Sequence, residues 1–178
     1  MGGHFEKIVF NCLQGIEEEF DADYHTKDLA AKDVATLHKM SAGKFGTDES
    51  GLFKLLCSRP TQHLKKVNTM YADKHDVTLF KVMEDELGGQ CRDATLFLLG
   101  MKLKPYATVA KLIKTVCKGI GTNELLLTSI MIRYQKILKE VMPAYEELYG
   151  ESLKERIRSE AGGDYGRLLQ ELCEAADD

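Results

Sequence analysis

The sequence contains no run of about 18 apolar residues, which is the length that a helix needs to cross a bilayer. Its first residues, MGGHFEKIVFNCLQG, lack both the basic flank and the small-residue cleavage site of a signal peptide. Any membrane contact is therefore expected to be peripheral. The net charge of −4 also counts against a nucleic-acid-binding role for the chain as a whole.

The cysteines lack the pattern of a metal site or of a disulfide framework. They form no CxxC pair, are odd in number at five, and lie within apolar helical patterns. We therefore expect reduced core residues in a cytoplasmic protein. The five positions are Cys12, Cys57, Cys91, Cys117 and Cys173.

Patterns typical of catalysis are missing as well. The histidines form no HExxH or other metal-ligand spacing, and no cysteine has a recognisable base partner. Glu84 and Asp85 are adjacent in exposed helical positions and indicate no acid–base pair. We expect no enzyme, and we expect each histidine to be a surface or capping residue. The five positions are His4, His25, His38, His63 and His75.

Proline and strand-like alternation are both scarce. Only three prolines occur in 178 residues, and apolar residues recur at spacings of three and four. This pattern predicts an all-α fold. The predicted buried helix faces are Leu64, Val67 and Tyr71 in one segment and Ile137, Val141, Tyr145 and Leu148 in another. Pro143 is expected to kink or break the later helix.

The sequence repeats itself over most of its length. The phrase KFGTDES at 44–50 returns as KGIGTNE at 118–124, with Gly46 and Gly121 in corresponding positions. Further corresponding pairs are Arg59 and Arg133, Tyr71 and Tyr145, Glu86 and Glu160, and Gly89 and Gly163. The two units end in ELGGQCRDATLFLL and EAGGDYGRLLQELC, and the start of the chain, GGHFEKIVFNCLQ, is a third instance of that ending.

Each full unit is predicted to contain five helices. They are expected at 33–42, 48–58, 61–74, 77–86 and 90–100, and again at 105–117, 123–133, 134–149, 152–160 and 164–175. The predicted organisation is the last helix of a truncated repeat at 1–15, an acidic linker at 16–31, and complete repeats at 32–101 and 102–178. Because the first repeat lacks its earlier helices, we expect part of a longer protein with an open apolar face and self-association through that face.

The repeated phrase has a purely structural interpretation. Glycine is favoured where a helix ends with positive φ, and Thr followed by acidic residues makes a good N-cap. A phosphate-binding loop is less well supported, because neither copy has the Lys-Ser/Thr ending of a P-loop and no strand precedes either copy.

A calcium site accounts for more of the sequence. Calcium takes six to eight oxygen ligands, and a glycine-rich loop can turn several carbonyls towards one point. A carboxylate follows each loop at a similar distance, Glu86 after Gly46 and Glu160 after Gly121. Such a site has one formal negative charge against the two positive charges of the ion. It should therefore be weak alone and leave positions open for an anionic phosphate oxygen.

Several segments resemble annexins. KGIGTNE, AYEELYGESL and SEAGGDYGRLLQELC are similar to the last annexin repeat, and SAGKFGTDES with CSRPTQHLKKV is similar to the third. The resemblance implies an all-α fold of annexin-like five-helix repeats, two complete and one represented by a single preceding helix. It also implies calcium-dependent binding to acidic phospholipid membranes, in the cytoplasm and on the cytosolic face.

The resemblance implies two sets of ligands for Ca²⁺. The later set would be the carbonyls of Cys117, Gly119 and Gly121 with the carboxylate of Glu160. The earlier set would be the carbonyls of Gly43, Lys44 and Gly46 with the carboxylate of Glu86. Asn123 replaces the usual Asp at a position that caps or supports the later loop. The earlier loop is shorter than in many third repeats, so it is the copy expected to be altered or empty.

Residues predicted to contact the membrane are Phe45, Ile120 and Lys118. Phe45 has an alternative role as a packing residue under its loop. Lys111, Lys114 and Lys118 share a helical face that would steer the protein towards anionic lipid, or else form a solvated face near a helix C-terminus. The alternative function for the whole chain is a calcium-independent scaffold with the annexin fold that holds protein partners.

Overall fold

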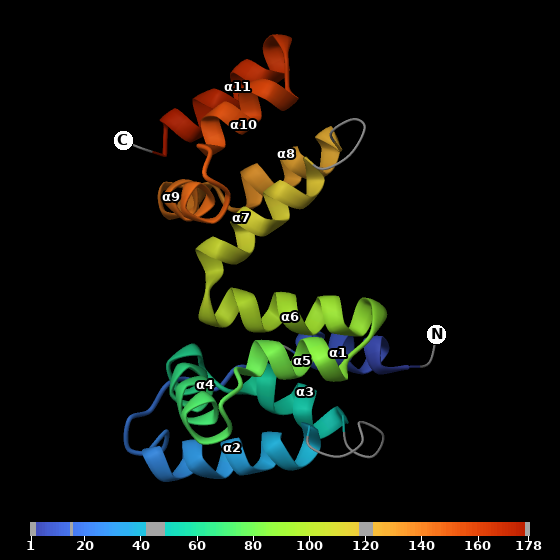
Figure 1. The fold of residues 1–178 in the computed structure, drawn as a ribbon, viewed down its shortest axis with the longest axis vertical. Helices are drawn as coiled ribbons and strands as arrows, with labels where there is room; N and C mark the ends of the chain where they lie inside the picture. The colour runs from blue at the N-terminus through green and yellow to red at the C-terminus, as the bar shows by residue number, and fades with distance from the viewer. Residues whose placement is uncertain (1–2, 15, 42–48, 118–122, 177–178) are drawn as a thin grey trace. The chain divides into compact units, whose positions relative to one another are not determined.

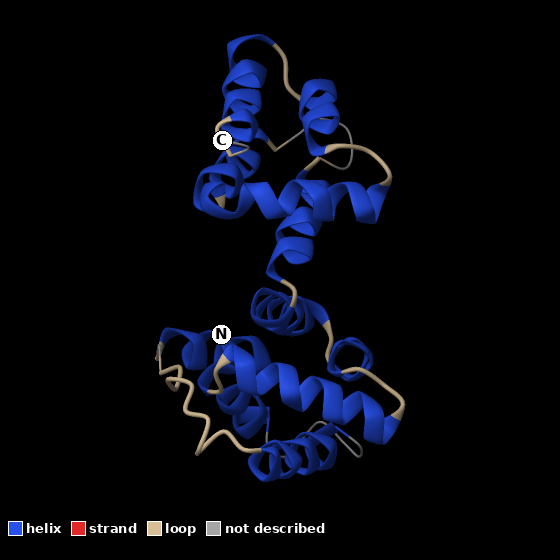
Figure 2. Cartoon of the chain, turned by 90° about the vertical axis from the view of Figure 1, so that its left-hand side faces the viewer, coloured by secondary structure: helices blue, strands red, loops and turns tan. Residues whose placement is uncertain are grey.

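The computed structural model describes residues 3–14, 16–41, 49–117 and 123–176, and all regular secondary structure in these ranges is helical (Figure 1, Figure 2). The prediction of an all-α fold is confirmed. The chain divides into two compact units, unit 1 from Met1 to Leu103 and unit 2 from Lys104 to Asp178.

Unit 1 contains six described helices. They are α1 (His4–Leu13), α2 (Lys27–Ser41), α3 (Glu49–Ser58), α4 (Thr61–His75), α5 (Leu79–Glu86) and α6 (Gly89–Leu103). Helix α2 packs against α4, and α1 packs against α3 and α6. The core of the unit includes Leu37, Phe53, Leu64, Val67 and Tyr71, each at most 1% exposed.

Helix α2 begins six residues earlier than predicted, at Lys27 rather than at 33. The side chain of Thr26 accepts a hydrogen bond from the backbone N–H of Leu29 at 3.3 Å, and Asp28 lies in the first turn. This is an N-cap with a favourable charge for the helix dipole. Residues 27–31, assigned to the linker from the sequence, therefore form the start of α2.

A polar network fastens the segment before α2 to the rest of unit 1. Arg59 donates to Asp33 Oδ2 and to Glu18 Oε2, both at 2.8 Å, and His63 Nε2 lies 2.8 Å from Asp33 Oδ2. His25 Nε2 lies 3.1 Å from the other end of the network at Glu18. His25 and His63 are 1% and 0% exposed, so the prediction of surface or capping histidines is wrong for both. Their ring nitrogens meet carboxylates inside the fold, which periodicity alone does not reveal.

Unit 2 contains five described α-helices and one 3-10 turn. They are α7 (Pro105–Val116), α8 (Glu124–Arg133), η1 (Gln135–Ile137), α9 (Leu138–Tyr149), α10 (Leu153–Glu160) and α11 (Gly163–Glu174). The break expected from Pro143 lies instead at η1, because α9 continues through Pro143. The predicted helix at 134–149 therefore begins with a 3-10 turn.

Tyr145 is the central aromatic residue of the unit 2 core and is fully buried, as its counterpart Tyr71 is in unit 1. Val141 is buried on the same face of α9, but Leu148 is 42% exposed, so its predicted burial is wrong. The i, i+4 spacing continues at Tyr149 instead, whose ring centroid lies 4.8 Å from that of Tyr145.

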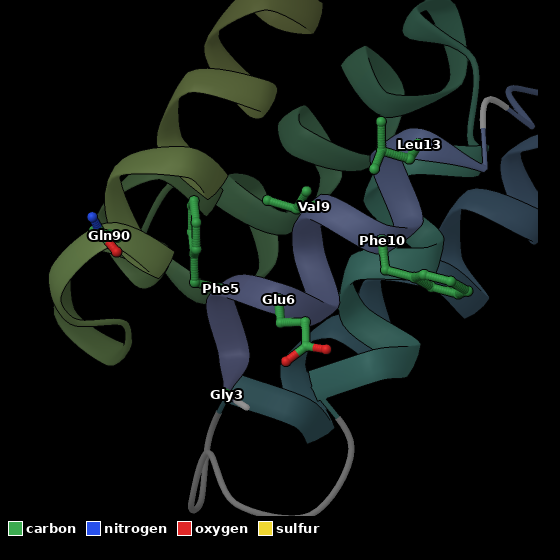
Figure 3. Close-up of a pocket in the computed structure, with 7 residues that line it drawn as sticks. All are labelled: Gly3, Phe5, Glu6, Val9, Phe10, Leu13 and Gln90. Atoms are coloured by element: carbon green, nitrogen blue, oxygen red, sulfur yellow. The ribbon is translucent and has the colours of Figure 1, made fainter. Parts of the chain in front are cut away.

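Helix α1 is apolar on two sides. Ile8 faces the core and is 1% exposed, whereas Phe5, Val9, Phe10 and Leu13 are 37–80% exposed. Phe5, Val9 and Leu13 lie on successive turns and line a shallow pocket of about 420 Å³ that also contacts Gln90 of α6 (Figure 3). We call Phe5, Val9, Phe10 and Leu13 the α1 apolar face.

Candidate functional site

The loop predicted to bind calcium in unit 2 connects α7 to α8. Helix α7 ends at Val116 with Cys117 as its C-cap, and the backbone N–H of Asn123 donates to the carbonyl of Val116 at 3.3 Å. That bond brings the two ends of the loop together. Gly119 and Gly121, with Lys118 and Ile120, lie outside the described residues.

Asn123 caps the helix that follows this loop. Its Oδ1 accepts a hydrogen bond from the backbone N–H of Leu126 at 3.0 Å. Of the two roles expected for this position, the capping role is confirmed, because Asn123 caps the start of α8. Asn and Asp are about equally good N-cap residues.

The turn between α10 and α11 is built on glycine. Gly163 has a φ of 59°, in the left-handed region that other residues rarely adopt. A Cβ on Gly166 would lie 2.2 Å from the carbonyl oxygen of Ala161, so α11 passes directly over the end of α10. The two helices run antiparallel side by side (Figure 1).

Tyr165 joins this turn to the start of α8. Its hydroxyl donates to the carbonyl of Glu124 at 3.0 Å and lies 3.1 Å from Oγ1 of Thr128. The beginning of α8 and the beginning of α11 therefore lie at the same end of unit 2. Glu160, the last residue of α10, is three residues before α11 begins.

The carboxylate of Glu160 is held in place at this end. Arg156 donates from Nη1 to Glu160 Oε1 at 3.0 Å, and the Glu160 side chain is 19% exposed. Burial, assisted by the negative charge of Glu160, raises the pKa of the Cys117 thiol to about 11. The structure thus places Cys117 and Glu160, two of the four predicted ligands, within electrostatic range of each other.

Arg156 is positioned in turn by Glu151, which the sequence analysis missed. Glu151 Oε1 accepts from Arg156 Nη2 and from Lys114 Nζ, both at 2.6 Å, and from the Tyr145 hydroxyl at 3.4 Å. The hydrogen bonds from Lys114 and Arg156 lower the pKa of Glu151. The i, i+4 spacing of Arg156 and Glu160 was the sequence signal that could have revealed part of this network.

Lys114 does not fit either role proposed for its helical face. It is 20% exposed, paired with Glu151, and its Nζ lies 5.0 Å from the centroid of the Tyr149 ring. A lysine engaged in this way neither steers the chain towards lipid nor forms a solvated face. Lys111 is exposed, and Lys118 lies outside the described residues.

The corresponding carboxylate in unit 1 has different surroundings. Glu86 is exposed, and its carboxylate makes no hydrogen bond or ion pair with the described residues. The position four residues earlier, where unit 2 has Arg156, is the buried Val82. The other members of this predicted site, Gly43, Lys44 and Gly46, lie outside the described residues, as does Phe45.

Two exposed leucines stand beside the unit 2 loop and were missed from the sequence. Leu125 and Leu126, in the first turn of α8, are 80% and 46% exposed. Their signal is the run ELLL, in which three leucines cannot all face the core of one helix.

The side chains of the described ranges offer no separate metal centre. Within those ranges, no group of three or more His, Cys, Asp and Glu side chains is arranged to hold a metal ion. In the same part of the chain, every helix is too short or too polar to span a bilayer. The Glu160 end of unit 2 combines a carboxylate with loop ends, which is the oxygen-rich type of donor set that calcium accepts.

Comparisons with known proteins identify the family. A family profile described as Annexin matches residues 32–98 and 108–172. Annexin A13 of Schistosoma japonicum is 30% identical over 171 residues, which cover 96% of this chain and 48% of that protein. The chain spans between about a quarter and about half of the length of the curated relatives it matches.

Solved structures have the same arrangement of helices. Annexin III superposes with a TM-score of 0.88 at 27% identity, and the match covers 97% of this chain and 53% of that protein. A calcium-bound annexin (Sm)1 has a TM-score of 0.84 at 22% identity, and the match covers 97% of this chain and 51% of that protein. The predicted fold of annexin-like five-helix repeats is confirmed.

Proposed function

This chain belongs to the annexin family, and from that premise we propose that it binds calcium and acidic phospholipid through the Glu160 end of unit 2. Annexins are generally calcium-dependent phospholipid-binding proteins without enzymatic activity. One relative with the same fold, annexin (Sm)1, has been solved in a calcium-bound form.

One observation carries the proposal. Arg156 holds the carboxylate of Glu160 partly exposed, at the end of unit 2 where the loop after Cys117 begins and ends. A carboxylate that is already fixed beside a glycine-containing loop can supply anionic oxygens, and the loop can supply carbonyl oxygens. Little side-chain conformational entropy of the carboxylate is then lost when an ion binds. The proposed ligands are the carbonyls of Cys117, Gly119 and Gly121 and the carboxylate of Glu160.

Bound calcium would link these oxygens to a phosphate oxygen of an acidic lipid. The chain supplies a single carboxylate there, so the anionic lipid completes both the charge and the coordination. Ile120 and Lys118 are proposed to contact the membrane, together with the exposed Leu125 and Leu126. Moving apolar side chains beside the loop from water into the bilayer interface lowers the free energy of the system.

The counterpart in unit 1 is proposed as a weaker site. It would use the carbonyls of Gly43, Lys44 and Gly46 with Glu86, and Phe45 would contact the membrane. The exposed Glu86 lacks the arginine that positions Glu160, so more side-chain freedom is lost when an ion binds.

Co-sedimentation with phosphatidylserine vesicles at a series of calcium concentrations tests this proposal. We expect the wild-type chain to sediment with calcium and to be released by a chelator. Glu160→Gln should raise the calcium concentration required by about tenfold or more, because a neutral amide replaces the only carboxylate ligand. Glu86→Gln is the matched control and should have a much smaller effect. If neither substitution nor the chelator changes the amount of protein that sediments with the vesicles, the proposal is refuted.

A calcium-independent scaffold is the second candidate function. The α1 apolar face favours it, because a patch of exposed aromatic and aliphatic side chains is typical of a protein interaction surface. Calorimetry that detects no calcium binding, even with phosphatidylserine vesicles present, would support this alternative.

We also propose that the chain self-associates through the α1 apolar face, and that it acts in the cytoplasm on the cytosolic face of membranes. Light scattering should give a mass that rises with concentration, since burying Phe10 and Leu13 removes apolar surface from water. Leu13→Glu should keep the chain monomeric, while Leu168→Glu, an exposed leucine of unit 2, should leave association unchanged. A strictly monomeric wild-type chain at high concentration would contradict self-association.

A further inference from the structure

Two of the five cysteines meet in unit 1. Cys12 lies on α1 and Cys57 lies on α3, and their sulfur atoms are 3.6 Å apart. The helices that carry them pack directly against each other. A disulfide holds its sulfurs about 2 Å apart, so this gap would have to shorten by about 1.6 Å when the bond forms.

These two cysteines also differ from the others in exposure. Cys12 is exposed and Cys57 is partly exposed, whereas Cys91, Cys117 and Cys173 are buried. The expectation that all five lie in the core is therefore wrong for Cys12 and only partly met for Cys57. A pocket of about 300 Å³, lined by Asn11, Gln14 and Lys54 among others, opens beside Cys57.

We propose that Cys12 and Cys57 form a reversible disulfide, a redox modification site that fastens α1 to α3. The oxidant would be a low-molecular-weight disulfide such as oxidised glutathione. The proposal is independent of calcium and lipid binding, because it uses neither loop and neither Glu160 nor Glu86.

The exchange proceeds in two balanced steps. The Cys12 thiol loses its proton to solvent, and its sulfur attacks one sulfur of glutathione disulfide, which releases one glutathione thiolate. The Cys57 thiol then loses its proton, and its sulfur attacks Cys12 Sγ to release the second glutathione. Two cysteines are oxidised to one disulfide, and one glutathione disulfide is reduced to two glutathione thiols.

The surroundings set the order of these steps. Burial, together with the neighbouring Cys12, raises the pKa of the Cys57 thiol to about 12. Cys57 is therefore a poor initial nucleophile, and the exposed Cys12 reacts first. The amine of Lys102 donates to the Cys57 carbonyl at 3.0 Å, and its positive charge favours loss of the Cys57 proton in the second step.

The bond would close a loop across much of unit 1. It joins residues 45 positions apart, and the loop includes Glu18 and His25 of the polar network as well as the whole of α2. Closing this loop lowers the conformational entropy of the unfolded chain and so stabilises the folded unit. It would also keep the α1 apolar face in a fixed position on unit 1.

Equilibration of the full chain with defined ratios of reduced and oxidised glutathione tests the proposal. Mass spectrometry after digestion without reductant should find peptides containing Cys12 and Cys57 linked to each other. A glutathione adduct on Cys12 should appear first and then decay. The oxidised chain should unfold at a temperature about 10 °C higher than the reduced chain, and a reductant should reverse the change.

Variants separate the pair from the other thiols. Cys12→Ser should remove both the linked peptide and the redox-dependent change in unfolding temperature, and Cys91→Ser should leave both unchanged. In denaturant the same glutathione ratio should give about tenfold less of the linked pair, since the fold no longer holds the sulfurs together. A stable adduct on Cys12 without the linked peptide, a disulfide between two chains, or equal yields in native and denatured protein would overturn the proposal.

Discussion

Glu86 and Glu160 end helices of eight residues, and each is followed by a Gly-Gly turn with a positive φ at the second glycine, 52° at Gly89 and 59° at Gly163. The two turns therefore share their residue pattern and a left-handed second glycine. The side chains one helical turn before the two carboxylates differ. Arg156 donates to Glu160 from one turn earlier, whereas the exposed Glu86 has the apolar Val82 at that position.

The difference shows that the repeated backbone and the repeated acid do not by themselves make two equal sites. In unit 2, Arg156 donates to Glu160 and also to Glu151, which accepts further hydrogen bonds from Lys114 and Tyr145. Unit 1 uses its own polar side chains at another place, where Arg59 joins Glu18, in the segment before α2, to Asp33 of α2. Substitutions at Gly166, Glu151 and His63 test this difference between the units.

The largest effect is expected from Gly166→Ala. The new Cβ would lie 2.2 Å from the carbonyl oxygen of Ala161, so α10 and α11 must separate. We expect a loss of about 2–3 kcal/mol in the free energy of unfolding, because the clash is with backbone rather than with a mobile side chain. Unit 1 tolerates a long side chain at the corresponding Arg92. Chemical denaturation measures the loss.

Gly162→Ala is the control for this substitution. A Cβ there meets nothing within 4 Å, and the φ of −106° suits any residue. The control should cost no more than about 1 kcal/mol. Equal losses for both variants would show that close packing of the α10–α11 turn does not set its stability.

Glu151→Gln should have an intermediate effect. Lys114 and Arg156 would lose their shared anion, and solvent screening limits the expected cost to about 1 kcal/mol. The folded state lowers the pKa of Glu151 below 4.5, so its contribution is present above pH 4.5 and is lost as the pH falls through the folded pKa. The variant and the wild-type chain should therefore differ at neutral pH and converge in acid. Hydrogen exchange resolved by helix would localise the loss to α7, α9 and α10.

The smallest effect concerns pH between neutral and mildly acidic values. Burial lowers the pKa of His63 below 6.5, although Asp33 acts in the opposite direction. Its Nδ1 is buried and has no hydrogen-bond partner among the described residues, so a proton added there finds no acceptor in that part of the chain. The stabilising contribution is present above pH 6.5 and falls as the pH drops through the folded pKa.

Between pH 6.5 and pH 4.5, unit 1 should therefore become more open to hydrogen exchange while unit 2 does not, because all five histidines belong to unit 1. His63→Gln should reduce this dependence on pH. A decline of equal size in both units would contradict the assignment to His63.

Much of the fold follows from local sequence patterns. The 3.6-residue periodicity predicted the helices. The repeated glycines predicted the turns, because few residue types other than glycine adopt the positive φ found at Gly89 and Gly163. The cap at Asn123 was also predictable, because capping depends on neighbours within one turn.

The errors mostly involve partners distant in the sequence. Lys114 and Glu151 are 37 residues apart, and His63 and Asp33 are 30 apart, so no local pattern reveals either contact. The start of α2 was missed for a local reason, because Thr26 caps it within a stretch whose acidic residues favoured a linker. The ligand sets at both loops remain predictions from family resemblance.

Leu125 offers a consequence for spectroscopy. The chain contains no tryptophan, and this side chain is 80% exposed in the first turn of α8, next to the loop of unit 2. A Leu125→Trp variant would therefore carry a single indole whose emission comes from one known place, free of any background indole signal. The colour of that emission, and its quenching by lipids labelled at different depths, would report how far this end of the protein enters a bilayer.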